Sequence, residues 1–286
     1  TSANASIRIQ GLDGRYTQIL KDGFPLFNGA ASGLGLLQIP PLDLKQVEVI
    51  KGSASTLYGG GAIAGLVNLI SKTPTDEREF KIHLNGTNAL GFDANLFYGK
   101  RFSKFGLTIF TSRNSNVAYD PSDINLSAIP EFQRYTVNPS LFFYPSDKTT
   151  IVWRINAGIE NRLGGNMDYI KENTSTGYFE KNKSERLSSQ LSIDHDFGEH
   201  SHLNIKQSVS YFNRQLSSPG YVFEGRQLNS FTEASYSRRG EIAEWVAGMN
   251  LWNENFEERP YSNFPVRNFQ QNTVGTFVHN TFKANE

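Results

Sequence analysis

Apolar and polar side chains alternate along most of the chain from about Phe80 onward. One stretch shows the pattern clearly, because its odd positions are apolar and its even positions are mostly polar. The apolar positions are Ile151, Trp153, Ile155, Ala157 and Ile159, and the polar ones are Arg154, Asn156 and Glu160. Alternation over about nine to eleven residues is what a tilted membrane-spanning strand requires, and no helical period is sustained in this region.

The alternation predicts ten antiparallel strands. We expect them at roughly 79–88, 91–103, 106–117, 132–144, 149–160, 184–197, 202–214, 228–238, 241–255 and 269–282. No apolar run approaches the length of about 18 residues that a transmembrane helix needs, so a spanning helix is excluded.

The connections between these strands alternate in length. Tight polar turns at 103–105, 145–148, 198–201 and 238–240 are separated by longer segments at 118–131, 161–183, 215–227 and 256–268. Short turns on one side and long loops on the other are typical of outer-membrane barrels. A soluble β-sandwich gives no reason for this sorting.

Aromatic side chains tend to end the strands that run into a tight turn. They are Phe102, Phe143, Tyr144, Phe197, Tyr236 and Phe282. Rings at one depth on successive strands favour an aromatic girdle at a membrane interface. The alternative is ordinary core packing, since Phe and Tyr favour strands in any sheet.

The first 75 residues have a different pattern. They are rich in Gly, and their short apolar runs at 18–20, 47–50 and 66–70 are bounded by turn signals at Asp22-Gly23, Lys51-Gly52 and Thr73-Pro74. We expect a small mixed domain over 1–75, followed by barrel strands over 76–286.

The small domain also carries a series of motifs. Their residues are Arg8, Gly11, Asp22, Gly23, Glu48, Lys51, Gly52, Leu57, Tyr58, Gly59, Gly65, Asn68 and Lys72. In order and spacing they resemble the C-terminal half of the plug domain of TonB-dependent receptors. Lys51 stands where that family usually has Arg, and Ala64 replaces a Gly.

This resemblance implies a membrane all-β fold, an antiparallel transmembrane β-barrel with a small α+β plug domain inside. Plugged barrels have about 22 strands, so the ten predicted here would be a part of the wall. The segment that contacts TonB would lie outside this chain, and the remaining barrel strands would belong to a longer or a separate chain.

The resemblance also implies a function in the outer membrane of a Gram-negative bacterium. The complete protein would be a TonB-dependent transporter that takes up a bulky nutrient, foremost a ferric siderophore. Cobalamin is the second expectation, because 22–40 resembles the corresponding stretch of vitamin B12 receptors, and haem is a weaker third. The expected partners are the TonB complex, outer-membrane lipids and a small-molecule metal chelate or vitamin.

Four plug residues are candidates for ligand contact: Arg15, Tyr16, Phe27 and Asn28. They lie in connections between plug strands, which the resemblance places nearest the external ligand. Packing against the barrel wall is the alternative for each. Glu48 and Lys51 are expected to pair either with polar groups of the inner wall or with each other on a surface.

Composition excludes several other functions. Lys plus Arg and Asp plus Glu both number 28, so the net charge of zero gives no basic face for nucleic acid. Cys is absent, which excludes disulfides and thiolate metal sites. His200 and His202 fall in a turn without a third ligand, so no metal site is expected. We find no catalytic constellation and no cofactor motif, and predict a protein that is not an enzyme.

A soluble carbohydrate-binding module or adhesin is the alternative from a different class. It would need its aromatic side chains gathered as an exposed platform, and it would purify without detergent. An outer-membrane enzyme would need a cluster of the Ser, His and Asp type or a cluster of carboxylates, and we find neither in the sequence.

Overall fold

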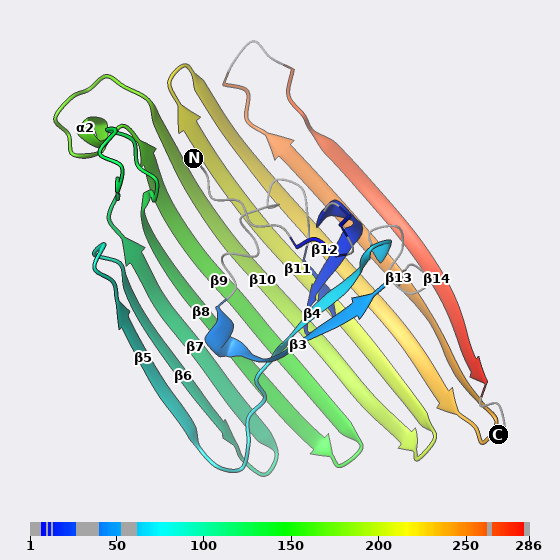
Figure 1. Ribbon diagram of the computed structural model, residues 1–286. Coiled ribbons are helices and arrows are strands. Elements are labelled where there is room, and N and C mark those ends of the chain that lie inside the picture. Colours follow the sequence, from blue (N-terminus) through cyan, green and yellow to red (C-terminus); the bar gives the residue numbers. More distant parts are fainter. Residues whose placement is uncertain are drawn as a thin grey trace.

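A computed structural model describes residues 7–9, 11–12, 14–26, 40–52, 62–261 and 265–282. Within these residues the named strands form two sheets, one of four strands and one of ten (Figure 1).

The large sheet is an antiparallel meander in which each strand pairs with the next along the chain, from β5 to β14. This confirms the predicted ten-stranded antiparallel architecture. The strands are β5 Glu79–Gly86, β6 Phe92–Arg101, β7 Phe105–Asn116, β8 Glu131–Ser146, β9 Thr149–Gly165, β10 Phe179–Gly198, β11 Ser201–Ser218, β12 Tyr221–Arg239, β13 Ala243–Glu258 and β14 Phe269–Phe282.

Several strands extend further toward the long loops than the sequence predicted. The largest correction is at 215–227, which we expected to be a loop. There β11 and β12 stay paired as far as Ser218 and Tyr221, and Pro219-Gly220 makes the turn. Gly220 has a φ of 74°, which suits the third position of a type II turn after Pro. The prediction of a long loop at this position is therefore wrong.

The outer face of the large sheet carries an apolar belt. On β10 the outward positions from Leu187 to Phe197 are mostly apolar, and the outward side chains beyond Leu187 are Glu185, Lys183 and Lys181. Ten residues cover about 33 Å along a strand, or about 23 Å of membrane thickness at a tilt of about 45°. This height is close to the apolar band of about 25 Å on outer-membrane barrels.

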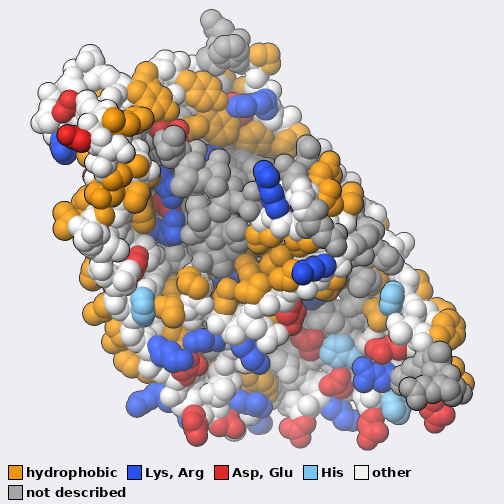
Figure 2. All heavy atoms as spheres, viewed as in Figure 1, with side chains coloured by type: hydrophobic (Ala, Val, Ile, Leu, Met, Phe, Trp, Pro, Cys, Tyr) orange, Lys and Arg blue, Asp and Glu red, His pale blue; other side chains and the backbone are white. Residues whose placement is uncertain are grey.

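Exposed aromatic side chains mark the edge of this belt near the short turns. Phe102, Phe143, Phe197, Tyr236 and Phe282 are all exposed there. Tyr144 differs from the prediction, because it is half-buried with the Arg101 guanidinium 4.1 Å from its ring centroid. Figure 2 shows charged side chains gathered beyond this edge, at the end where the short turns lie. The arrangement fits a periplasmic rim in water.

The small sheet lies across the other face of the large sheet (Figure 1). Its order is β2-β1-β4-β3, with β1 parallel to β4 and the other pairs antiparallel. The strands are β1 Thr17–Lys21, β2 Phe24–Pro25, β3 Leu44–Lys51 and β4 Gly65–Ser71. Three of them contain the predicted short strands. We call this sheet, with its connections, the plug, and the large sheet the wall.

Two positions in the plug depend on Gly, one in a turn and one at the start of β4. Asp22 and Gly23 have φ values of 54° and 75°, as a two-residue type I′ hairpin turn requires. Gly65 has a φ of 143°, and a Cβ there would overlap the Ile50 carbonyl oxygen. Close pairing of β3 and β4 therefore needs Gly at 65.

The described helices are single turns. They are η1 Gly14–Tyr16, η3 Pro41–Asp43 and α2 Met167–Ile170, the last in the connection between β9 and β10. Within the described part of the chain, no helix is long and apolar enough to cross a membrane.

An arginine in the middle of the apolar belt is expected to destabilise the wall. Ile155→Arg should cost about 2–4 kcal/mol, because the guanidinium would face hydrocarbon near the midplane. Asn161→Arg is the matched control on the same face of β9 but beyond the belt, and should cost about 0–1 kcal/mol. Denaturant titration of the receptor folded into phospholipid vesicles measures both. Equal effects would contradict the placement of the belt.

Candidate functional site

Two buried charged side chains of the plug meet two amides of the wall. The Lys21 Nζ lies 2.9 Å from the Asp43 Oδ2, and both residues are buried, at 5% and 6% exposed. Lys21 also donates to the Asn156 Oδ1 at 2.9 Å, and the Asn138 Nδ2 donates to the Asp43 Oδ2 at 3.0 Å. We call these four residues the plug anchor.

The local structure holds both charges in place. Lys21 is the last residue of β1, directly before the Asp22-Gly23 turn, and Asp43 ends η3. The Asp43 carbonyl accepts a hydrogen bond from the Lys72 backbone N–H at 2.9 Å, which ties η3 to the end of β4. A buried ion pair repays its desolvation only when further hydrogen bonds satisfy both partners. The two wall amides supply them.

A second contact joins the plug turn to β9. Asp22 accepts hydrogen bonds from the Ser71 backbone N–H at 2.8 Å and from its hydroxyl at 2.7 Å. The Arg154 Nε lies 3.3 Å from the Asp22 Oδ2, close enough for an ion pair but not aligned for a hydrogen bond. Asp22 therefore stabilises its own turn through Ser71 and forms an ion pair with the buried Arg154 of the wall.

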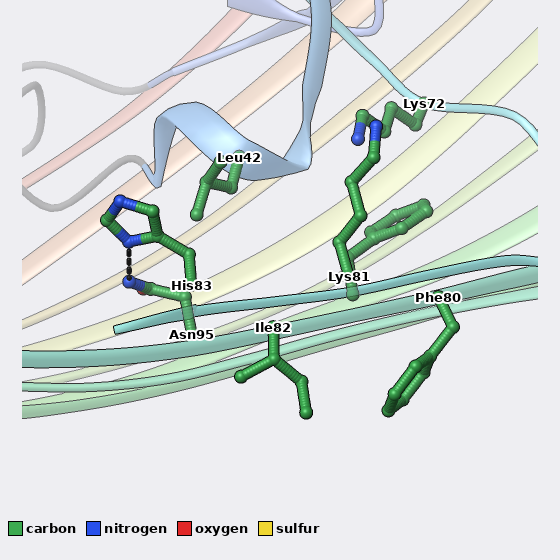
Figure 3. Close-up of a pocket in the computed structure, with 8 residues that line it drawn as sticks. Leu42, Lys72, Phe80, Lys81, Ile82, His83 and Asn95 are labelled. Carbon is green, nitrogen blue, oxygen red and sulfur yellow. Dashed lines mark hydrogen bonds between the residues drawn. The ribbon is translucent and has the colours of Figure 1, made fainter. Parts of the chain in front are cut away.

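A cavity of about 380 Å³ lies on the other side of η3, against β5 and β6. Its lining residues are Leu42, Lys72, Phe80, Lys81, Ile82, His83, Asn95 and Phe97. In Figure 3 Lys81, His83 and Asn95 lie on the plug side of the wall, while Phe80 and Ile82 point away from it. Lys72 and Lys81 both contact the Glu79 Oε1, at 2.8 and 2.7 Å.

The inner wall carries a further charged cluster on β8 and β9. The Arg134 Nε donates to the Glu160 Oε2 at 2.6 Å, and the Arg162 Nη2 lies 3.1 Å from the Glu160 Oε1. Glu160 is buried. Two cations of the inner face therefore share the buried Glu160 carboxylate.

Two polar contacts lie at the ends of β12 and β13, away from the short turns. Tyr261 donates to the Glu224 Oε2 at 2.6 Å, and this hydrogen bond raises the pKa of the Tyr261 phenol. Arg267 binds the two carboxylate oxygens of Glu258 at 2.7 and 2.8 Å, which raises the pKa of the Arg267 guanidinium. Tyr261 thereby lies against the end of β12, and Arg267 against the end of β13.

The four predicted ligand contacts are only partly covered by the structure. Tyr16 ends η1 and packs against the plug core of Ile9, Ala64, Val67 and Leu69. Arg15 lies in the same helical turn. Phe27 and Asn28 lie outside the described residues, as does the Arg15 side chain. Ligand contact by these residues stays a prediction.

The plug motif residues serve mainly the plug itself. Glu48 accepts hydrogen bonds from Gln46 and Asn68 within the plug sheet, so the expected pairing with the inner wall is not found among the described residues. The Asn68 Oδ1 accepts from the Gly23 N–H at 3.0 Å. Gly11 and Gly52 have positive φ values, and Arg8 and Lys51 are exposed. Leu57, Tyr58 and Gly59 lie outside the described residues.

Sequence reasoning missed most of the plug anchor. Of its four residues only Asn156 was assigned to the polar face of a strand, together with its neighbour Arg154, and the structure places that face inward. Lys21, Asp43 and Asn138 gave no comparable signal. Lys21 and Asp43 are 22 residues apart, and no local pattern links them.

The described residues contain no group of three or more His, Cys, Asp or Glu side chains placed to hold a metal ion. His202 instead lies 2.8 Å from the Asp196 Oδ1 and 3.3 Å from the Asp194 Oδ1 at the short-turn end of the wall.

Removing one charge of the plug anchor should be costly. Lys21→Met would leave Asp43 as an unpaired buried carboxylate, and we expect a loss of about 3–5 kcal/mol. The double variant Lys21→Met/Asp43→Leu removes both charges and should recover most of that loss. Thermal and denaturant unfolding of the purified receptor measure the difference. A single variant as stable as the parent would show that the pair does not fix the plug.

Comparison with known proteins agrees with this arrangement. The family model of the TonB-dependent Receptor Plug Domain matches residues 1–66. The ferrioxamine receptor of Yersinia enterocolitica is 30% identical over 169 residues, which are 56% of this chain and 22% of that receptor. The vitamin B12 transporter BtuB of Vibrio vulnificus is 32% identical over 104 residues, 36% of this chain and 17% of that transporter.

A solved structure extends the match to nearly the whole fold. The siderophore receptor PirA from Acinetobacter baumannii superposes with a TM-score of 0.74 at 14% identity, covering 97% of this chain and 48% of that one. The chain thus spans about half of that solved receptor and a smaller share of the curated relatives. Residues 1–66 thus match the plug domain of TonB-dependent receptors, and the fold of nearly the whole chain is that of a solved outer-membrane siderophore receptor.

Proposed function

We propose that this chain forms plug and wall segments of a TonB-dependent transporter that takes up a ferric siderophore. One observation carries the proposal: a small sheet is anchored by buried ion pairs to the polar face of a sheet whose opposite face is an apolar belt. A wall of this kind separates hydrocarbon from a polar interior, and the plug fills that interior. The likeness to a ferrioxamine receptor and a siderophore receptor favours an iron chelate.

The domain division follows the two sheets. We propose that 1–75 is the plug part and 76–286 the barrel part, with the segment after β4 as the link. β5 and β14 each pair with one neighbour among the described strands. Since unpaired backbone groups are not tolerated in hydrocarbon, their free edges would pair with further strands, of the same polypeptide or of a separate chain. TonB would act on the plug from the periplasmic side.

Uptake measurements with defined cargoes test the transport proposal. Cells that depend on the receptor containing this chain are given radioactive iron as ferrioxamine or ferric enterobactin, or radioactive cobalamin. We expect uptake of a ferric chelate that is abolished in a TonB-deficient strain or by a protonophore. Uptake of cobalamin alone would establish the second candidate, which the likeness to BtuB supports. Uptake that persists without TonB would contradict the proposal.

We also propose that Arg15, Tyr16, Phe27 and Asn28 contact the ligand. Tyr16→Ala should weaken binding about tenfold, because an aromatic contact at the centre of an interface is worth about 1–2 kcal/mol. Binding of the transported cargo to the purified receptor measures this, with Tyr135→Ala on the outer wall as the control. Because Tyr16 also packs on the plug core, the thermal stability of the Tyr16→Ala receptor is measured alongside its affinity. Unchanged affinity would remove Tyr16 from the ligand site.

A further inference from the structure

The plug is held unequally by the two sides of the wall that the structure describes. Toward β8 and β9, the plug anchor and the pair of Asp22 with Arg154 join buried charges to the wall. Toward β5 and β6, the cavity lies beside η3, and the charged contact between plug and wall is the less buried pair of Lys72 with Glu79. Two neighbouring residues of η3 face these two sides. Asp43 binds Asn138 of β8, and Leu42 lines the cavity next to β5 and β6.

The cavity lies within the height of the apolar belt. Its lining residues Lys81 and His83 alternate along β5 with Phe80, Ile82 and Leu84, whose apolar side chains are exposed on the outer face. A ligand that crosses between η3 and this part of the wall therefore passes the cavity.

The lining of the cavity suits groups that carry negative charge. Lys72 and Lys81 share one carboxylate, that of Glu79, which leaves one positive charge in excess. The Lys72 ammonium also lies 4.4 Å from the ring centroid of Phe97. Phe97 and Leu42 supply apolar surface beside the ammonium groups. The volume of about 380 Å³ is within the range of small-molecule sites.

We propose that this cavity is a transit site on the uptake path. Anionic oxygen groups of the metal chelate contact Lys72 and Lys81 as it passes between η3 and the β5–β6 wall. The contacts with β8 and β9 meanwhile keep the plug attached on its other side. This inference rests on the proposed transport function and adds the side of the plug along which the ligand moves.

Cysteine labelling tests the path without a known ligand. The chain has no Cys, so single substitutions in the full receptor report one position each. Asn95→Cys lines the cavity, Ala94→Cys is its lipid-facing neighbour on β6, and Ser192→Cys is a buried inner-wall position on β10. We expect a membrane-impermeant maleimide to label Asn95→Cys in energised cells, faster than in cells without TonB, and to leave the other two unlabelled. TonB-dependent labelling of Ser192→Cys, with none at Asn95→Cys, would overturn the proposal.

Transport variants test the chemistry of the site. Lys81→Glu should slow uptake of the transported ferric chelate about tenfold, since a charge that attracts the ligand becomes one that repels it. Lys148→Glu makes the same charge change in the turn between β8 and β9, outside the cavity, and should leave uptake unchanged. Asn95→Phe should also slow uptake by filling the cavity, whereas Ala94→Phe should not.

Measuring ligand affinity distinguishes a site on the transport path from the external binding site. Neither Lys81→Glu nor Asn95→Phe should change the dissociation constant measured at the external side of the receptor. Normal uptake in both variants would overturn the transit site. Uptake of cobalamin without uptake of either ferric chelate would refute the proposed cargo, while TonB-dependent labelling at Asn95→Cys would still locate the path.

Discussion

The structure depends on one constraint, that backbone N–H and C=O groups cannot be left unpaired in hydrocarbon. A polypeptide that crosses the membrane as strands must therefore pair each strand with its neighbours. The ten strands from β5 to β14 meet this condition by pairing in chain order. Because side chains alternate along each strand, one face of the sheet can be apolar and the other polar. This alternation accounts for the apolar belt on the outer face and for the buried polar side chains on the inner face.

The polar inner face makes it possible to hold a plug by electrostatic contacts. Charges such as Lys21, Asp43 and Arg154 are costly to bury, and they are stable here because plug and wall supply partners for each other. These contacts are more buried toward β8 and β9 than toward β5, where Lys72 pairs with Glu79. The cavity beside η3 lies on the side with the less buried contact.

The sequence predicted the wall well because its signal is local. Alternation and turn residues lie within a few positions of each other, and they placed all ten strands. The wrong prediction of a long loop at 215–227 also concerns a local signal. The length of the polar segment there suggested a loop, and the tight turn that Pro219-Gly220 favours was overlooked. The plug anchor could not be predicted, since Lys21, Asp43, Asn138 and Asn156 meet only in the folded structure. The motifs of the plug indicated the family, but most of their described residues support plug turns and strands.

The most direct measurement of the central claim is the environment of successive side chains along β9. Spin labels attached to single cysteines from 151 to 159, in the receptor reconstituted in lipid bilayers, report access to oxygen from the lipid side and to a polar nickel complex from water. We expect odd positions to be reached by oxygen with a period of two, and even positions to be shielded from oxygen by the plug. Odd positions shielded from oxygen, or no alternation at all, would contradict a lipid-facing wall around a plug.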